Sequence, residues 1–318
     1  MVIDEKELIE DLYPIMMEQV KKDFNDGLFD DHLLTLSNMS SGLSEKNVLS
    51  ETKLLEIWVN YRINYQIQKF YAKQPEMFGG FKRINGEEHI RKVLELGGVF
   101  VSFQYGNHRF NPLALGKKIS SSEQYLNRIV DTDSYKIEKQ DMEWSRLYQE
   151  CKVDEIISNH LNNDPKLSQI MSKRESLYFY LDGEAGFDED DAPVNVNFLG
   201  GKIKAPSSIF RLAVKFHKPV CFLMAEQDET GQPVLTAYEP VWLHDKNVEN
   251  TVQVFYSIFE DILLKQPELW KKWDQPRKSL PKVKTKDTSS GHKVDVLNRF
   301  GTHGLNIQSG EIYQIVNG

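Results

Sequence analysis

Residues 86–103 read GEEHIRKVLELGGVFVSF, and this stretch decides the fold class. Its first half has apolar residues at helical spacing and predicts a short helix that ends at Gly97 and Gly98, because glycine readily adopts the left-handed conformation of a helix C-terminus. Residues 99–103 follow as an apolar run of strand length. A helix, a glycine pair and a buried strand in immediate succession predict an α/β protein.

The rest of the chain extends this pattern in both directions. Apolar and β-branched runs predict further strands at residues 127–131, 177–181, 219–225 and 234–238. Apolar residues at helical spacing predict helices at residues 4–24, 52–74, 206–216 and 250–266, and one after Pro112. The polar residues 138–173 read as helix-rich. We therefore expect a mixed central sheet flanked by helices.

Three consecutive segments are expected. Residues 1–80 form an N-terminal helical segment, residues 81–278 the α/β core, and residues 279–318 a basic linker with a C-terminal β-hairpin. Within the first, residues 25–51 read as a loop because small polar residues accumulate there, namely Ser37, Ser40, Ser41, Gly42 and Ser44. Residues 271–286 are basic and contain two prolines, which is typical of a surface linker.

Bulk composition excludes several classes of protein. The chain has 318 residues, with 39 basic and 47 acidic side chains and a net charge of -8, which argues against nucleic-acid binding through overall charge. Cys151 and Cys221 are too few for a disulfide framework or a cysteine metal cluster, and read as buried thiols. Residues 1–24 are charged throughout, so we expect no membrane anchor and a cytoplasmic location.

Common catalytic motifs are also missing from the sequence. There is no G-x-S-x-G, P-loop, G-x-G-x-x-G or H-E-x-x-H pattern, so hydrolase, kinase, dinucleotide-binding and zinc-protease functions are not supported. The acidic residues 188–191 lack the spacing of a calcium loop and read as a solvated loop. We expect no metal and no cofactor.

Four ordered blocks resemble the bacterial lipid A late acyltransferases and their lysophospholipid-acyltransferase relatives. They are RINGEEHI (83–90) with GGVFVSF (97–103); QYGNHR (104–109); YLDGE (180–184) with segments of 197–223; and QPELWKKW (266–273). The resemblance covers about residues 50–278. It implies a glycerolipid-acyltransferase type of fold and transfer of an acyl group from acyl-CoA or an acyl carrier protein.

The second block departs from the family at its two chemical positions. The family pattern H-[FY]-G-N-W-E falls on residues 104–109, where Gln104 replaces the histidine and Arg109 replaces the glutamate. In the family the histidine takes a proton from the acceptor hydroxyl and the carboxylate orients its ring. A carboxamide is no base at neutral pH and a guanidinium stays protonated, so this mechanism does not carry over unchanged.

Three interpretations remain open. In the first, His108 acts as the base and Asp182 or Glu184 orients it, although an isolated histidine is more often a hydrogen-bonded packing residue. In the second, Arg109 holds an anionic group of the ligand, or else forms an ion pair with Asp182 or Glu184. In the third, the protein is a catalytically inactive relative that serves as a binding or scaffold subunit.

The expected function is therefore acyl transfer to a hydroxyl or amine of a small-molecule, lipid or peptide acceptor, with the inactive binding subunit as the alternative. The resemblance implies substrate contacts from Gln104, Asn107, Arg109, Phe198, Gly200 and Arg211. Residues 198–201 line an acyl groove or form a turn after a strand.

Two features near the C-terminus also leave alternatives open. The basic residues 271–286 contact a membrane surface or an acidic carrier protein, or are a solubilising linker. Residues 304–315 alternate like a hairpin and faintly resemble the first strands of small peptide-binding domains, or simply cover an edge of the sheet.

Overall fold

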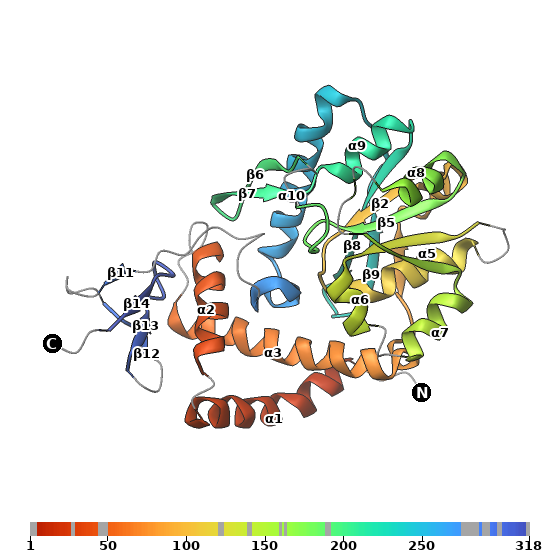
Figure 1. Ribbon diagram of the computed structural model, residues 1–318. Coiled ribbons are helices and arrows are strands. Elements are labelled where there is room, and N and C mark those ends of the chain that lie inside the picture. Colours follow the sequence, from red (N-terminus) through yellow and green to blue (C-terminus); the bar gives the residue numbers. More distant parts are fainter. Residues whose placement is uncertain are drawn as a thin grey trace. The chain divides into compact units, whose positions relative to one another are not determined.

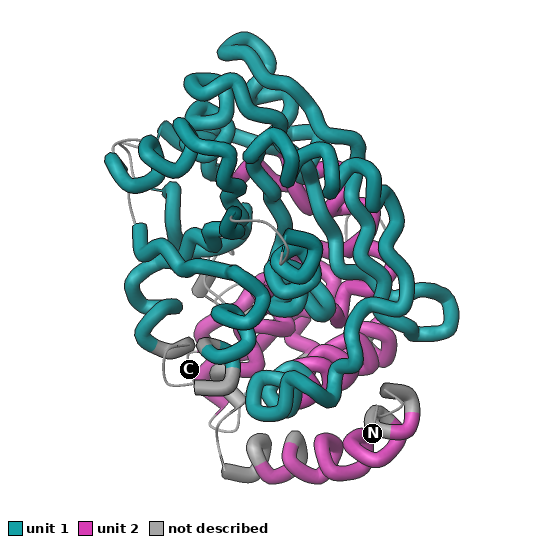
Figure 2. The backbone as a smooth tube through the Cα atoms, turned by 90° about the vertical axis from the view of Figure 1, so that its right-hand side faces the viewer, with its two compact units in different colours: residues 1–5, 68–196, 204–256 teal, residues 6–67, 197–203, 257–318 magenta. Residues whose placement is uncertain are grey.

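The computed structural model divides into two compact units, each discontinuous in sequence. Unit 1 comprises residues 1–5, 68–196 and 204–256, and unit 2 comprises residues 6–67, 197–203 and 257–318 (Figure 2). This division follows contacts in space rather than the three consecutive segments expected from the sequence. The structure describes residues 5–26, 29–43, 50–119, 124–138, 142–158, 161, 164–187, 192–274, 286–287, 293–297 and 301–315.

Unit 1 is built on an eight-stranded mixed sheet. The strand order is β1 (Arg83–Asn85), β9 (Pro233–Ala237), β8 (Pro219–Gln227), β2 (Val99–Ser102), β5 (Ser176–Tyr180), β3 (Leu126–Val130) and β4 (Val153–Ile157), while β10 (Val241–Trp242) also pairs with β8. The five strands from β8 to β4 are parallel, whereas β9 is antiparallel to β8. The predicted fold class, α/β with a mixed central sheet flanked by helices, is confirmed.

Helices cover both faces of this sheet (Figure 1). Parallel crossovers are right-handed, so connections that run toward β4 lie on one face and connections that run back toward β8 lie on the other. Contacts between α4 and α5, α5 and α7, and α8 and α9 follow this rule. The helices that connect the strands of this sheet include α4 (Glu87–Leu96), α5 (Asn111–Ile119), α6 (Thr132–Glu138), α7 (Met142–Glu150), α8 (Pro165–Ser172) and α9 (Ser208–Lys215).

The helix–glycine–strand stretch adopts the predicted structure. Gly97 has a φ of 66° and its N–H bonds the carbonyl oxygens of Val93 and Leu94, as expected of a helix C-terminus. A Cβ atom on Gly97 would lie only 2.6 Å from the backbone of Arg174, so this turn requires glycine for space as well as conformation. The four residues of β2 are fully buried.

The segment 138–173 contains a strand that the sequence prediction missed. Besides α7 and α8 it holds β4, whose sequence VDEII mixes acidic and apolar residues. The strand lies at the edge of the sheet, with Val153 and Ile156 buried and Asp154 and Ile157 exposed. A half-exposed edge strand tolerates charges that a central strand would exclude, and these charges weaken its pattern.

Unit 2 contains most of the N-terminal helices and the C-terminal segment. Its elements are α1 (Glu5–Asp26), α2 (Phe29–Leu43), most of α3 (Glu51–Lys73), and a four-stranded sheet of β11 (Lys286–Asp287), β14 (Ile312–Gln314), β13 (His303–Leu305) and β12 (Val296–Leu297). The hairpin predicted near the C-terminus is present as β13 and β14. It belongs to this separate sheet and does not pair with the central one.

The predicted loop at residues 25–51 is wrong for most of its described length, because α2 lies there. The Ser37 hydroxyl donates to the Gly310 carbonyl oxygen at 2.6 Å, and the Ser40 hydroxyl donates to the Ile307 carbonyl oxygen. A Cβ atom on Gly42 would lie 3.0–3.3 Å from Leu199 and Trp273. The small residues are therefore used for close packing within unit 2, and Ser44 lies outside the described residues.

The predicted surface linker at residues 271–286 is also wrong at its start. Residues 271–274 form the 3₁₀ helix η6 (Lys271–Asp274), in which Trp273 is fully buried and donates its indole N–H to the Pro267 carbonyl oxygen at 2.7 Å. Trp273 packs edge-on against Trp270. Residues 275–285 lie outside the described part of the chain, as does the acidic loop 188–191.

The remaining elements are α10 (Val248–Leu263), the hairpin of β6 (Val194–Phe198) and β7 (Gly201–Ala205), and the short helices η1 (Pro75–Phe78), η2 (His108–Phe110), η4 (Asp245–Asn247) and η5 (Pro267–Leu269). In unit 1, Phe255 of α10 stacks on Phe222 of β8 at 5.0 Å. Over the described residues, no helix has the length and apolar character needed to cross a bilayer.

Candidate functional site

The candidate site lies where β2 and β5 end. These strands are adjacent and parallel, with Ser102 opposite Tyr180, so the residues that follow them meet at one edge of the sheet. The backbone N–H of Gln104 donates to both carboxylate oxygens of Asp182, at 3.0 and 3.1 Å. Asp182 is only 2% exposed. The two segments are therefore joined by a buried hydrogen bond to a carboxylate.

A second hydrogen bond fixes the segment that precedes Asp182. The Tyr256 hydroxyl donates to the Leu181 carbonyl oxygen at 3.1 Å. Burial, and then the negative charge of Asp182, raise the pKa of Tyr256 well above 10. Tyr256 therefore remains a protonated donor at any physiological pH. The turn that contains Asp182 is thus fixed both by the Tyr256 hydroxyl and by the Gln104 N–H.

The retained Tyr-Gly-Asn of the second block has structural roles. Tyr105 is fully buried, and Gly106 has a φ of 53°. A Cβ atom on Gly106 would lie 2.5 Å from the Ala225 carbonyl oxygen. Asn107 is also buried, and its side-chain oxygen accepts from the Gln68 amide at 2.6 Å. These contacts fix the turn that carries the chain from β2 into η2.

His108 opens η2 and is only 3% exposed. Its Nδ1 lies 3.1 Å from the Gly106 carbonyl oxygen, and a carbonyl can only accept, so Nδ1 carries the hydrogen. In the neutral ring Nε2 is then the atom that can accept a proton. The ring meets Tyr180 edge-on at 5.6 Å, and the Tyr180 hydroxyl donates to the His108 carbonyl oxygen at 2.9 Å.

The Arg109 side chain points toward Trp144 of α7. Its guanidinium carbon lies 5.1 Å from the centre of the Trp144 ring, within range of a cation–π contact. The Trp144 indole N–H donates to the Ala72 carbonyl oxygen at 2.8 Å, which fixes the ring beneath the guanidinium. Arg109 is half-buried, so its charge is held in place while part of it remains accessible.

Two more predicted residues lie on segments that reach this edge of the sheet. Glu184 follows Asp182 by two positions and is exposed. Arg211 lies in α9, whose N-terminus faces the same edge because α9 precedes the parallel strand β8. The Arg211 Nε–H donates to the Ser207 hydroxyl at 3.2 Å. Arg211 is thus oriented toward the start of its helix.

Phe198 and Gly200 belong to unit 2, unlike the other predicted site residues. Phe198 is 1% exposed, stacks on Phe259 at 5.7 Å and meets Trp270 edge-on at 5.7 Å. Leu199 and Gly200 have φ values of 49° and 74° and turn the chain from β6 into β7. These contacts are consistent with the interpretation that residues 198–201 form a turn after a strand.

The sequence analysis did not predict a buried polar network that joins residues of β2, β5 and α5. The Asn111 amide donates to the Tyr178 hydroxyl at 3.1 Å and to the Ser102 hydroxyl at 3.3 Å. Burial raises the pKa of Tyr178 to about 12. Next to it, Arg128 bonds Glu155 at 2.7 Å. The sequence feature that could have revealed this network is the two-residue spacing of Tyr178 and Tyr180 in an otherwise apolar strand, because this spacing puts both side chains on one face.

No protein-family model matches the chain, and no curated protein is similar to it in sequence. Within the described ranges, no three His, Cys, Asp or Glu side chains are grouped so that they could hold a metal ion. The site must therefore be interpreted from its own geometry.

Proposed function

We propose that this protein is acyltransferase-like, with a fold of the glycerolipid-acyltransferase type, and that it acts on an acyl thioester at the carboxyl ends of β2 and β5. The observation that carries this proposal is the hydrogen bond from Gln104 to Asp182, two residues that are 78 positions apart. It joins two of the four resembling blocks. Ligands of open α/β sheets bind at this edge, which also supports the choice of site.

The chemistry proposed for the site uses His108 as the base. Nε2 takes the proton of the acceptor hydroxyl while the oxygen attacks the thioester carbonyl. The tetrahedral intermediate then expels the carrier thiolate, which recovers that proton from the imidazolium. An ester and a free thiol result. Arg109, partly accessible over Trp144, would hold an anionic group of the carrier or acceptor.

A second candidate is a binding subunit without catalytic activity. The burial of His108 and its bond to Gly106 favour this alternative. A general base must come within hydrogen-bond reach of the substrate, and a residue as buried as His108 needs the η2 segment to move first. In this case the strand ends would recognise an acylated ligand and release it unchanged.

One experiment separates the candidates. Purified protein is incubated with radiolabelled hexadecanoyl-CoA and with hexadecanoyl acyl carrier protein, and both free thiol and labelled product are measured. The variants are His108→Ala and, as the matched control, His89→Ala, which removes a partly exposed histidine that lies 3.5 Å from Glu88. Circular dichroism confirms that both variants are folded.

Turnover that disappears in His108→Ala and persists in His89→Ala supports the enzyme. Binding of the acylated donor without turnover supports the binding subunit. The incubation is repeated with acyl chains from four to eighteen carbons on both carriers. If none of these donors binds or reacts, both candidates are refuted.

A further inference from the structure

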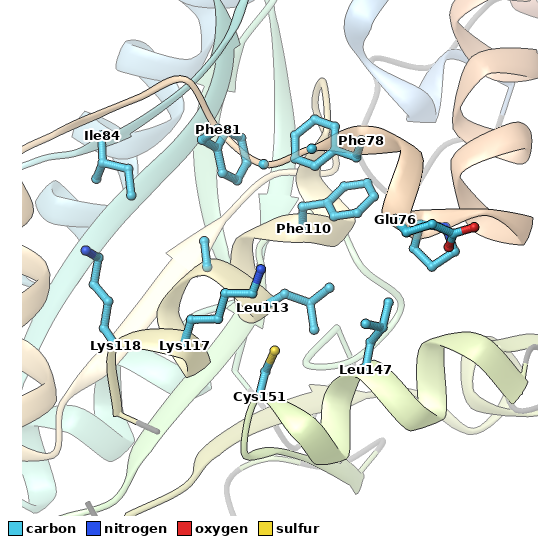
Figure 3. Close-up of a pocket in the computed structure, with 14 residues that line it drawn as sticks. Glu76, Phe78, Phe81, Ile84, Phe110, Leu113, Lys117, Lys118, Leu147 and Cys151 are labelled. Atoms are coloured by element: carbon cyan, nitrogen blue, oxygen red, sulfur yellow. The ribbon is translucent and has the colours of Figure 1, made fainter. Parts of the chain in front are cut away.

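A cavity of about 650 Å³ lies on the outer side of α5 in unit 1 (Figure 3). Its walls come from residues 75–84, from Phe110 and the exposed face of α5, and from Leu147 and Cys151 at the end of α7. No residue predicted from the sequence as part of the functional site lines it. The volume falls within the range of about 300–1,000 Å³ that is typical of small-molecule sites.

The walls of this cavity are mainly apolar. Phe78 and Phe110 stack with ring centres 3.9 Å apart, and Phe81 meets Phe78 edge-on at 5.3 Å. Phe110, Leu113 and Ala114 lie on one helical stripe. The opposite side of α5 packs on β3 and β4, so α5 presents apolar residues on two faces. A helix of this kind needs an apolar partner on its second face as well.

Two lysines of the same stripe line the cavity, and one of them is paired with a carboxylate. Lys117 and Lys118 lie in the last turn of α5, and the Lys118 ammonium is 2.6 Å from a carboxylate oxygen of Glu87. Figure 3 shows the Lys118 side chain extending toward Ile84 and the Lys117 side chain extending toward the middle of the cavity. Their alkyl stems add to the apolar wall and their ammonium groups form its charged edge.

Cys151 reinforces the apolar character of the wall. Burial raises the pKa of its thiol, while the nearby charge of Lys117 acts in the opposite direction. The thiol therefore stays protonated at neutral pH and behaves as a small apolar group. The cavity thus combines an apolar floor with Lys117 and Lys118 on one side, and the carboxylate of Glu76 lies on the opposite side (Figure 3).

We infer that this cavity binds a free long-chain carboxylate, with its alkyl chain against the phenylalanine rings and its carboxylate at Lys117. A methylene group takes roughly the liquid volume of a water molecule, about 30 Å³, so a chain of about 12–16 carbons fits with room for the head group. The lysines lie at the end of α5 that is farther from His108, about 9–11 Å along the helix axis from Asn111, and no residue of the proposed transfer site lines the cavity. This site is therefore separate from the proposed transfer site and does not depend on it.

Binding is measured by calorimetry with three ligands of equal chain length: hexadecanoate, hexadecanol and hexadecyltrimethylammonium. We expect hexadecanoate to bind most tightly and the cation least. Lys117→Met should weaken hexadecanoate binding by about two- to fivefold, as for an exposed ion pair, and leave hexadecanol binding unchanged. Lys92→Met, which removes an exposed lysine of α4 that does not line the cavity, is the matched control and should change neither.

Equal affinity for the acid and the alcohol, or equal effects of the two lysine variants, would overturn the assignment of the head group. Ala114→Trp fills the cavity and should abolish binding of both ligands. Because a bulky variant can fail to fold, a hexadecanoate carrying a photoreactive diazirine on its chain provides an independent test. Crosslinks recovered in residues 75–84 or 110–118 support the site, and crosslinks found only elsewhere refute it.

Discussion

Replacing Asp182 should loosen the turn at the candidate site and lower the stability of unit 1. Asp182→Ala removes the charged acceptor of the Gln104 N–H, a type of hydrogen bond that contributes about 1.5–3 kcal/mol. With a shift of about 2–4 °C per kcal/mol for a domain of this size, a loss of about 2 kcal/mol lowers Tm by about 4–8 °C. Asp182→Asn keeps one acceptor oxygen and should lose about half as much.

The assay is thermal unfolding followed by circular dichroism, with Glu184→Ala as the control. Glu184 lies on the same turn but is exposed, so its removal should change the free energy of unfolding by no more than about 0.5 kcal/mol. Equal shifts for Asp182→Ala and Glu184→Ala would show that the Gln104 contact does not hold the two strand ends together. The reasoning about the site would then be refuted.

Three further predictions concern the turn, the second unit and pH. Gly106→Ala puts a Cβ atom 2.5 Å from a backbone oxygen of β8. It should lower the free energy of unfolding by well over the about 1–2 kcal/mol expected for Gly231→Ala, where a left-handed glycine has open space around it. Equal losses of stability in the two variants would exclude a steric cause. Ser37→Ala should destabilise unit 2 by about 1 kcal/mol in urea unfolding, through loss of the bond to Gly310. Burial raises the pKa of Glu268 above 4.5, so its ionised form is penalised in the folded state. The free energy of unfolding therefore falls as pH rises from about 4.5 through the raised pKa of Glu268. Glu268→Gln should be more stable than the wild type at pH 7 but not below pH 4.5. An advantage that persists at pH 4 would contradict this cause.

The sequence predicted the central strands well because they are buried on both faces. β2 and β5 read as continuous apolar runs with no competing interpretation, and the glycine pair before β2 marks the helix end. β4 was missed because an edge strand is solvated on one side and its acidic residues interrupt the pattern. An apolar run in the sequence indicates a buried segment. It therefore identifies a strand reliably only where that strand is fully buried.

The error at α2 has a different physical cause. Serine and glycine favour loops in isolation, but here Ser37 bonds a carbonyl oxygen 273 residues away. Gly42 likewise allows close approach of Trp273. Tertiary contacts of this kind outweigh helix propensity, and no local window of sequence contains them.

The site was predictable only in part. The resemblance implied that Asp182 could act together with the second block, and in the structure Asp182 accepts the Gln104 N–H where β2 and β5 end. The sequence analysis kept open that His108 is a hydrogen-bonded packing residue, but it could not predict the contacts that bury His108, because these follow from the left-handed turn at Gly106 and from Tyr180 on a neighbouring strand. Topology is encoded in patterns along the chain, whereas side-chain roles depend on contacts between distant segments.

The central claim is that the ends of β2 and β5 recognise an acyl thioester. A crystal structure with the thioether analogue of hexadecanoyl-CoA, in which a methylene replaces the reactive carbonyl, tests it most directly. The account predicts that the analogue's sulfur lies beside residues 104–109, within hydrogen-bond distance of His108 or the Gln104 side chain. An analogue bound only elsewhere, including one whose chain occupies the α5 cavity while its sulfur is remote from residues 104–109, would contradict the claim.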